Sequence, residues 1–468
     1  MKILKYLNCD FMDYNLILKD IKPTDDEKIK INKVSNDLIN YLQETCDNNN
    51  IDANVSLVGS VAKNTALKRK SDIDIFIAFS LDTEMDYLKK TGLELAHKCC
   101  DEFNGVASHH FASHPYVTAD IEGFEVDIVP CYAISDGSEL KSAVDRTILH
   151  TKYIKSNLTI KQEDEVLLLK RFMAMTGTYG SEFKVGGFAG YLCELLIIYY
   201  GSFENTLMSA VGWKFGESID LKEYGTSKLF DDHLIVIDPT DKNRNVAAAL
   251  RLDKMAEFIQ SARNYLSSDN KSDYFYPLNK NLNKENILNE FNKRNGDTIA
   301  IRFKIPEMPL DTLHPQLRKT CEALERKLNA EEFNVFKSDY WSDEKEYCVI
   351  LLEMASSTLN DIKVNIGPKV FINKACERFT AKYGIENCYI QDDFLVHTQK
   401  REFGKAQDLI KHIFTKEHIS LIKVGKNLKN NLINTYEFIS VEDIDLNFLD
   451  DFIKPGQYIV RLNQFNGK

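Results

Sequence analysis

The chain has 468 residues, of which 44% are hydrophobic and 28% charged, an ordinary balance for a globular protein with room for two to four domains. No apolar run is long enough to cross a bilayer, and the charged N-terminal segment Met1–Tyr6 lacks the apolar centre of a signal peptide. The ten cysteines form no C-x-x-C pair, which favours reduced thiols over a disulfide framework or a zinc site. These features exclude a membrane-spanning protein and predict a cytoplasmic one.

The net charge of −11 disfavours a nucleic-acid partner when it is taken as a whole, but the charge is unevenly distributed. Residues 1–150 carry 25 acidic and 16 basic side chains, whereas residues 400–429 carry eight basic and three acidic ones. The basic segment 400–429 fits either an RNA-binding surface or a solvated helix face, and charge alone does not decide between them.

The first 150 or so residues mix helices and strands. Thr24 and Glu27 have the spacing of a capping box, ahead of apolar residues that recur at helical intervals. Strands are expected at Val55–Val58, at Asp72–Phe79 and at Phe124–Val129, the last one stopped by Pro130.

The remainder divides into a helical part and a second mixed part. Residues 163–263 have a helical pattern, and a polar stretch at 266–296 marks a boundary. Beyond it, the segments Thr298–Phe303 and Tyr347–Leu352 are typical of strands, and they flank a helix around Gln316–Leu328.

Carboxylates on two of the expected strands form the most informative pattern. Side chains two residues apart in a strand point to the same side, so Asp72 and Asp74 face together, while Asp127 comes from another strand. Three carboxylates brought together repel one another unless a cation lies between them, and their oxygens suit Mg²⁺. Two such ions can support an in-line phosphoryl displacement.

A small-residue pair precedes these carboxylates. Gly59-Ser60 should open a helix near Val61, where the backbone can approach a phosphate and free N–H groups point at it. Lys63 lies one turn along, and the basic run Lys68-Arg69-Lys70 is a further candidate for triphosphate or RNA contacts. Taken alone, a D-x-D motif is usually a pair of surface acids and Gly-Ser is usually a turn. Their combination at this spacing, with a third acidic strand, indicates nucleotidyl transfer.

Gly-Ser followed by Asp-x-Asp is the signature of the DNA-polymerase-β-like nucleotidyltransferase superfamily. Over nearly its whole length the chain further resembles the class I (archaeal-type) CCA-adding tRNA nucleotidyltransferases, less closely after about residue 300. The stretches that carry the resemblance are residues 57–63, 72–76, 126–132, 142–153, 186–196, 200–203 and 237–249.

The resemblance implies template-free addition of C, C and A to the 3′ end of tRNA from CTP and ATP, with Mg²⁺ as cofactor. It implies metal binding by Asp72, Asp74 and Asp127, and nucleotide binding by Gly59, Ser60, Lys63, His150, Lys170, Tyr179 and Arg244, with Arg244 bordering the pocket that selects the base. It also implies that the tRNA acceptor arm lies along the C-terminal domains, and family members often form homodimers.

The residues themselves leave alternatives open. His150 also suits a structural histidine, Lys170 a solvated position at the end of its helix, and Tyr179 either base stacking or a cap on the core. Arg244 stands at an expected helix start, where a cation opposes the helix dipole and a phosphate partner would explain it.

We therefore expect an α+β multidomain protein with a polymerase-β-like head at residues 1–155. A helical neck is expected at 156–275, and an α+β body at 276–468 with a tail subdomain at about 365–425. Rival functions are a poly(A) polymerase, an oligoadenylate-type synthetase or an antibiotic nucleotidyltransferase, which share the carboxylates but not the stretches Arg146–His150 and Arg244–Ala247. A non-enzymatic RNA-binding protein with a degenerate transferase domain is disfavoured because all three carboxylates are present.

Overall fold

The computed structural model describes residues 12–68, 72–111, 115–280 and 282–460. The chain forms two compact units. The first runs to Asn279 and takes up the chain again from Gly456, and the second is Lys280–Pro455. Each unit has its own hydrophobic core, so each is described by itself.

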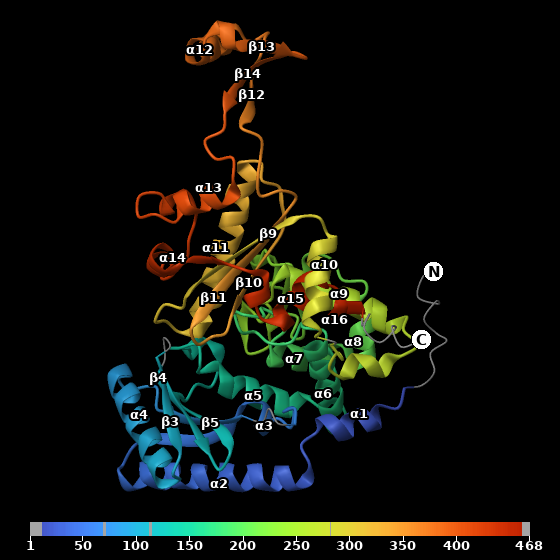
Figure 1. Cartoon of the computed structure of the whole chain (residues 1–468). Helices are drawn as coiled ribbons and strands as arrows, with labels where there is room; N and C mark the ends of the chain where they lie inside the picture. Colours follow the sequence, from blue (N-terminus) through green and yellow to red (C-terminus); the bar gives the residue numbers. More distant parts are fainter. Residues whose placement is uncertain (1–11, 69–71, 112–114, 281, 461–468) are drawn as a thin grey trace. The chain divides into compact units, whose positions relative to one another are not determined.

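A five-stranded sheet forms the N-terminal part of the first unit (Figure 1). Its strand order is β1-β2-β5-β4-β3, with β2 and β5 parallel and the other pairs antiparallel. The strands are β1 (Ala53–Val58), β2 (Ile73–Phe79), β3 (Val106–Phe111), β4 (Pro115–Ile121) and β5 (Phe124–Tyr132). The three predicted strands are confirmed as β1, β2 and β5.

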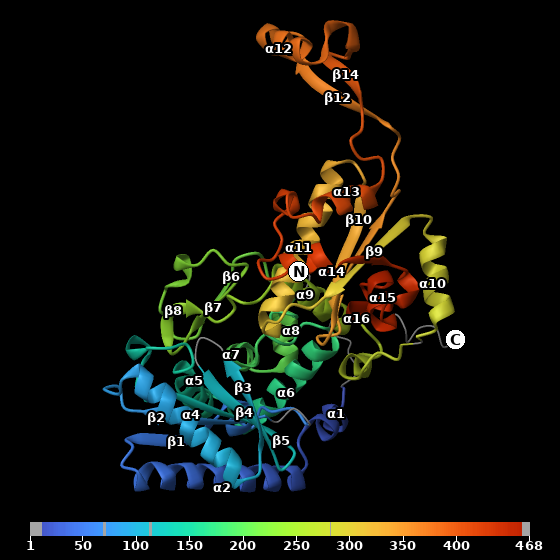
Figure 2. The same cartoon turned by 60° about the vertical axis from the view of Figure 1, so that its left-hand side comes forward.

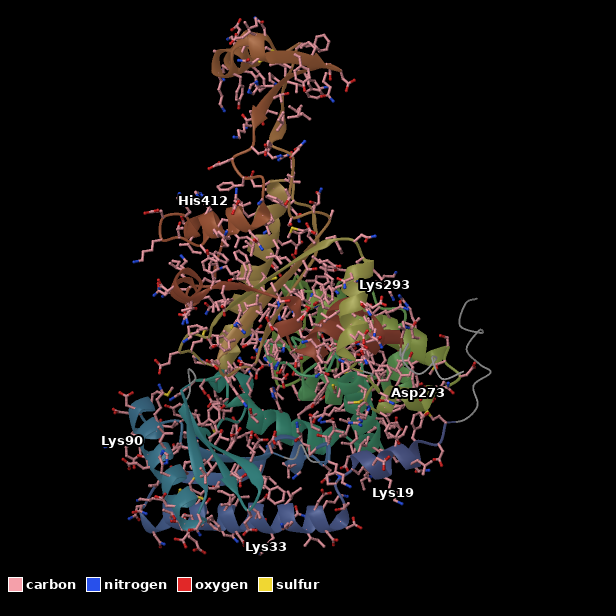
Figure 3. All side chains as sticks on the ribbon, in the orientation of Figure 1. Lys19, Lys33, Lys90, Asp273, Lys293 and His412 are labelled. Carbon is pink, nitrogen blue, oxygen red and sulfur yellow. The ribbon has the colours of Figure 1, made fainter. Side chains whose placement is uncertain are left out.

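Helices α2 (Asp25–Asn48) and α4 (Met85–Glu102) cover one face of this sheet, as Figure 2 shows from a second side. The predicted capping box is confirmed, since Thr24 Oγ1 accepts the Glu27 N–H and the Glu27 carboxylate accepts the Thr24 N–H. Lys33 and Lys90, labelled in Figure 3, are exposed residues of these two helices. The polar sides of both helices therefore face solvent while their apolar sides build the core.

The predicted end of β5 at Pro130 is wrong, because the strand continues to Tyr132. Pro130 lies opposite Ile77 of β2, and the pairing with β4 on the other side ends at Ile128. A proline is tolerated at a position where the ladder does not need its missing N–H.

Five helices and a small sheet follow in the first unit: α5 (Arg146–Asn157), α6 (Ile160–Met175), α7 (Gly190–Tyr200), α8 (Phe203–Ala210), α9 (Leu252–Leu266), β6 (Glu217–Asp220), β7 (Leu234–Asp238) and β8 (Asp241–Asn245). The expectation of helix throughout 163–263 is therefore wrong for Glu217–Asn245. The β-branched run Ile235–Ile237 is buried on both sides, and a short buried strand does not show the alternation that marks a strand in sequence.

The C-terminal segment returns to the first unit. Helix α16 (Gln457–Val460) packs beside α9, where Asn264 donates from Nδ2 to the carbonyl oxygen of Ile459 at 3.1 Å. Gln457 is buried at 1% exposure. The division at residues 155 and 275 remains a prediction. The short N-terminal helix α1 (Tyr14–Ile21) also belongs to this unit.

The second unit is built around a four-stranded sheet of order β10-β11-β9-β15. Its strands are β9 (Asp297–Lys304), β10 (Val335–Ser342), β11 (Tyr347–Met354) and β15 (Glu437–Ile439), and its helices are α10 (Lys284–Lys293), α11 (Leu310–Ala330), α13 (Ala406–Ile413), α14 (Lys429–Thr435) and α15 (Leu446–Ile453). The strands and the helix predicted between residues 298 and 352 are confirmed as β9, β11 and α11.

A three-stranded sheet, β12 (Ile362–Lys369), β14 (Phe394–Lys400) and β13 (Cys388–Gln391), carries helix α12 (Asn373–Tyr383) within the same unit. Helix α13 does not belong to this small sheet, since its apolar residues join the core of the four-stranded sheet. Across the described ranges, no helix combines the length and the apolar character needed to span a membrane.

Candidate active site on the five-stranded sheet

Asp74 and Asp127 lie opposite each other on the parallel strands β2 and β5. The neighbouring residues Ile73 and Ile75 point to the other face of the sheet, where they are fully buried beneath α2 and α4. Because side chains alternate along a strand, Asp74 and Asp127 share the face away from those helices. The fold thus places two of the predicted carboxylates next to each other.

The electrostatics of Asp74 reflect this crowding. Burial, followed by the negative charges of Asp127 and Asp72, raises the pKa of Asp74 to about 7, against an opposing effect of Lys63. Asp72 is exposed and lies just before β2, outside the strand that the sequence predicted to begin with it. Thr118 Oγ1 donates a hydrogen bond to Asp127 Oδ1 at 2.5 Å. A carboxyl with like charges around it favours a proton or a cation.

Gly59 lies directly against this pair. Its φ is +72°, and a Cβ at this position would overlap the carboxylate oxygen Oδ2 of Asp74. The position therefore requires glycine for two reasons, a left-handed backbone and the close approach of the Asp74 carboxylate.

Ser60 lies in helix α3 (Gly59–Ala62), so the helix predicted near Val61 is confirmed, although it is a single turn. The Ser60 carbonyl accepts hydrogen bonds from the Lys63 N–H at 3.3 Å and the Thr65 N–H at 3.0 Å. A single turn has a small dipole, so its role at the site is to fix the path of the chain to Lys63 and Thr65.

Lys63 and Lys170 meet at one buried carboxylate, Glu194 of α7. Lys63 Nζ lies 2.6 Å from Glu194 Oε2, and Lys170 Nζ lies 3.3 Å from Glu194 Oε1. Lys170 is 2% exposed, so the solvated position allowed by the sequence is wrong. Although burial raises the pKa of Glu194, the two ammonium groups outweigh it and hold the pKa below its ordinary value.

Tyr179 approaches the same place from the loop after α6. A Cβ built on Gly190 would lie 3.3 Å from the Tyr179 hydroxyl and 3.5 Å from Lys170 Nζ, so both groups converge on the first turn of α7. Tyr179 is partly buried against the core, and its burial raises the pKa of the phenol. The structure thus places Tyr179 beside Lys170.

A second polar cluster is centred on Asp238, at the end of β7. Its Oδ2 lies 2.9 Å from His150 Nε2 and 2.8 Å from Arg244 Nη1, and its Oδ1 accepts a hydrogen bond from the Tyr191 hydroxyl at 3.2 Å. The ring of Tyr191 stacks on His150 at a centroid distance of 3.8 Å. Burial lowers the pKa of His150 despite its acidic partner, which favours a neutral imidazole.

Arg244 does not stand at a helix start, so that expectation is wrong. It lies in strand β8, where Asp238 on the neighbouring strand compensates its charge. The opposition to a helix dipole that suggested a phosphate partner therefore does not exist here.

The sequence analysis did not identify Glu194 or Asp238 as site residues, although each has a recognisable sequence context. Glu194 is the one charged residue in the apolar run of α7, and Asp238 ends a run of aliphatic residues just before Pro239. A charge in such surroundings needs a partner when the segment is buried, but only the fold shows which residue provides it.

The site is chemically suited to a divalent cation. In the described ranges, no group of three or more His, Cys, Asp and Glu side chains that could hold a metal ion is present. The fit depends instead on the pair Asp74 and Asp127, which lie opposite each other on β2 and β5 and offer carboxylate oxygens.

Comparison with known protein families accounts for most of the chain. Family models match a nucleotidyltransferase domain at residues 38–150, the second domain of tRNA nucleotidyltransferase at 164–276, and the C-terminal domain of the CCA-adding enzyme at 294–441. Nucleotidyltransferases of this kind generally use divalent metal ions.

Several relatives of similar length are all CCA-adding enzymes. The CCA-adding enzyme of Methanothermobacter thermautotrophicus is 43% identical over 96% of this chain and 99% of the relative. The CCA-adding enzyme of Methanosarcina acetivorans is 37% identical over 93% and 94%, and that of Methanocaldococcus jannaschii 37% over 90% and 92%. At this identity and coverage, with the carboxylate pair on its sheet, the chain belongs to the CCA-adding enzymes, a family of tRNA nucleotidyltransferases.

Proposed function

We propose that this chain adds C, C and A in turn to the 3′ end of tRNA, with reaction at Asp72, Asp74 and Asp127. The observation that carries the assignment of these residues is the register of Asp74 opposite Asp127, which crowds negative charge at one point. In each step the tRNA 3′-hydroxyl attacks the α-phosphorus of CTP or ATP, and pyrophosphate leaves.

Mg²⁺ would be held by the carboxylates of Asp72, Asp74 and Asp127, whose oxygens match its preference. When bound, it supplies positive charge against the triphosphate and favours ionisation of the attacking hydroxyl. Gly59 keeps the backbone close beside Asp74, so that nothing bulkier stands between the carboxylates and a phosphate.

The triphosphate would be bound by Ser60 and Lys63, with Lys170 and Tyr179 behind them. Lys63 fits this role because its ammonium lies near enough to Asp74 to affect that carboxyl's pKa. Lysine offers a point charge rather than a bidentate fork, so its contact with a phosphate is less directional than that of an arginine.

The base would lie against the Asp238 cluster, with His150 and Arg244 as its polar contacts. Because His150 is neutral and its Nε2 faces Asp238, its Nδ1 remains an acceptor. Cytosine and adenine both carry an exocyclic amino group, whereas uracil and guanine carry a carbonyl oxygen at the corresponding position, so an acceptor here favours C and A.

The second partner would be the acceptor arm of tRNA, bound by shape and phosphate contacts. The basic segment 400–429, which contains α13, is our candidate for part of this surface. A homodimer, expected from the family resemblance, and a cytoplasmic location, expected from the cysteine usage, remain predictions.

The decisive experiment incubates the purified protein with tRNA trimmed of its 3′ end and each NTP separately, with Mg²⁺. We expect C addition from CTP, a single A only after two C residues, and no addition by Asp127→Asn. Long A tracts would instead identify a poly(A) polymerase, and transfer to an aminoglycoside would identify an antibiotic nucleotidyltransferase.

Asp238→Asn tests the base contacts. Loss of the shared charge frees Arg244 and weakens the hydrogen bond that orients His150, so we expect misincorporation of UMP to rise by about tenfold relative to CMP. Arg263→Gln, which removes an exposed arginine elsewhere in the same unit, should leave the ratio unchanged. An unchanged ratio in Asp238→Asn would contradict this assignment.

A further inference from the structure

The two lysines assigned to the triphosphate differ in how they are bonded. Lys170 Nζ donates three hydrogen bonds within the protein: to the Thr65 carbonyl at 2.9 Å, to Thr65 Oγ1 at 3.2 Å and to Glu194 Oε1 at 3.3 Å. An ammonium has three N–H groups, so these contacts use all of them. In this arrangement, the Lys170 ammonium is therefore held in place by Thr65 and Glu194.

Lys63 is bonded differently. Its ammonium donates to Glu194 Oε2 at 2.6 Å and lies 5.9 Å from the ring centroid of Tyr191. Lys63 directly follows helix α3, whose first residue, Gly59, lies against the Asp74 carboxylate. An ammonium has three N–H groups and Lys63 donates one of them to Glu194, so it can also donate to a phosphate.

Glu194 joins both lysines and is itself completely buried. Thr65 Oγ1 donates to Glu194 Oε1 at 2.6 Å, so the two carboxylate oxygens accept from three different side chains. The pair of lysines and this one carboxylate leave a single net positive charge. Burying two ammonium groups without the carboxylate would be strongly unfavourable.

We infer, on the basis of the proposed function, that Glu194 is a positioning residue that holds the Lys63 ammonium at the triphosphate, with Lys170 and Thr65 bracing it from behind. Three separate segments meet here: the loop after α3, helix α6 and helix α7. Glu194 therefore ties the strand-bearing part of the unit, which carries the carboxylates, to the helices behind it.

The test is a double-mutant cycle on the full-length protein with trimmed tRNA. Glu194→Gln should lower kcat/KM for CTP and for ATP by the same factor, about ten- to a hundredfold, since a charge-assisted hydrogen bond to the phosphate ligand is lost and no base contact changes. In a Lys63→Met background, the same substitution should add less than about threefold, because two residues that act through one contact are not additive.

Two further variants keep the result interpretable. Glu257→Gln removes a partly exposed partner of Lys254 on α9 and should leave kcat/KM unchanged. Lys170→Met combined with Glu194→Gln removes two of the three buried charges and leaves only that of Lys63. It should therefore fold even where Glu194→Gln alone does not, while Lys63 stays unanchored and kcat/KM stays low.

The inference is overturned when Glu194→Gln is as active as the wild type, when its loss is fully additive with Lys63→Met, or when CTP and ATP are affected by different factors. Wild-type activity in the Lys170→Met, Glu194→Gln variant overturns it as well. Failure of the wild-type protein to extend trimmed tRNA would instead refute the proposed function itself.

Discussion

At the scale of single residues, the site depends on a few positions where backbone, charge and packing coincide. Gly59 is the clearest case, since its positive φ and the Asp74 carboxylate beside it both exclude a side chain. Gly123, in the turn between β4 and β5, also has a positive φ, of +82°, but a Cβ there would meet nothing within 4 Å. Substitution of Gly123 therefore tests the effect of backbone strain alone, whereas substitution of Gly59 tests strain together with overlap with the Asp74 carboxylate.

Gly59→Ala should therefore lose about a hundredfold in kcat with trimmed tRNA and CTP, because the added methyl displaces Asp74. Gly123→Ala should lose a similar ~1–2 kcal/mol of unfolding free energy from its left-handed backbone, yet keep its activity. Equal activities of the two variants, with both folded by circular dichroism, would contradict the role given to Gly59.

The raised pKa of Asp74 has a consequence for stability without metal. Because the folded-state pKa, about 7, lies above the ordinary value of 3.8, the folded protein binds this proton more tightly than the unfolded chain does. The contribution of Asp74 to stability is therefore present at acid pH and declines as the pH rises from about 4 to 7.

Asp74→Asn, which is uncharged at every pH, should be stabilised relative to the wild type by more at about pH 7.5 than at about pH 5 when unfolding is followed in EDTA, with a slope of at most about 1.4 kcal/mol per pH unit. Asp101→Asn, an exposed position on α4, is the control. A wild-type advantage that grows with pH would contradict the sign, and added Mg²⁺ should shrink the difference at the higher pH.

At the scale of elements, local context decided where the sequence pattern could be trusted. The Thr24–Glu27 capping box and the strands with alternating or aliphatic patterns formed as expected. The strand β5 did not end at Pro130 as predicted. Its pairing with β4 ends before that residue, so the missing N–H of the proline is tolerated and the strand continues. Arg244 lies on strand β8 rather than at a helix start, and Asp238 of the neighbouring strand β7 compensates its charge.

Two exposed cations of the basic segment lie at helix α13, Lys405 as its N-cap and Lys411 within it. Arg401 is already paired with Glu332 at 2.5 Å, and Lys411 lies 3.4 Å from Asp408, whereas Lys405 at the start of the helix is exposed. His412, labelled in Figure 3, stacks on His418 at 3.8 Å in the same segment. The apolar side of α13 is buried, so its cations face solvent.

Lys405→Glu combined with Lys411→Glu should weaken tRNA binding and reduce the slope of log K against log salt by about one for each phosphate that the variant no longer binds. Lys284→Glu combined with Lys293→Glu on α10 changes the charge of the same unit equally at exposed positions. Fluorescence titration with tRNA at two salt concentrations compares the affinities of the two double variants. Equal losses of affinity in both would exclude a specific role for α13.

At the scale of the whole molecule, the first unit is built from two separate segments of the chain. Residues from Gly456 rejoin it after the second unit is complete, and α16 packs on α9 through Asn264 and Ile459. The end of the chain therefore contributes to the stability of the unit that carries the candidate site, although it is far from that site in sequence.

Deletion of residues 456–468 should therefore increase hydrogen exchange in α9 while leaving β11, in the centre of the other unit's sheet, protected. Mass spectrometry of peptides from both elements measures the difference. Loss of protection in β11 with α9 unchanged would show that the segment belongs with the second unit.

The sequence by itself determined the transferase motif, the family and most strands and helices, because glycine, paired carboxylates and hydrophobic period are local properties. Only the tertiary structure showed that Glu194 joins Lys63 to Lys170 and that Asp238 joins His150 to Arg244. Burial removes water from such charges, so each must find a partner. That partner is chosen by packing between segments that are distant in the chain.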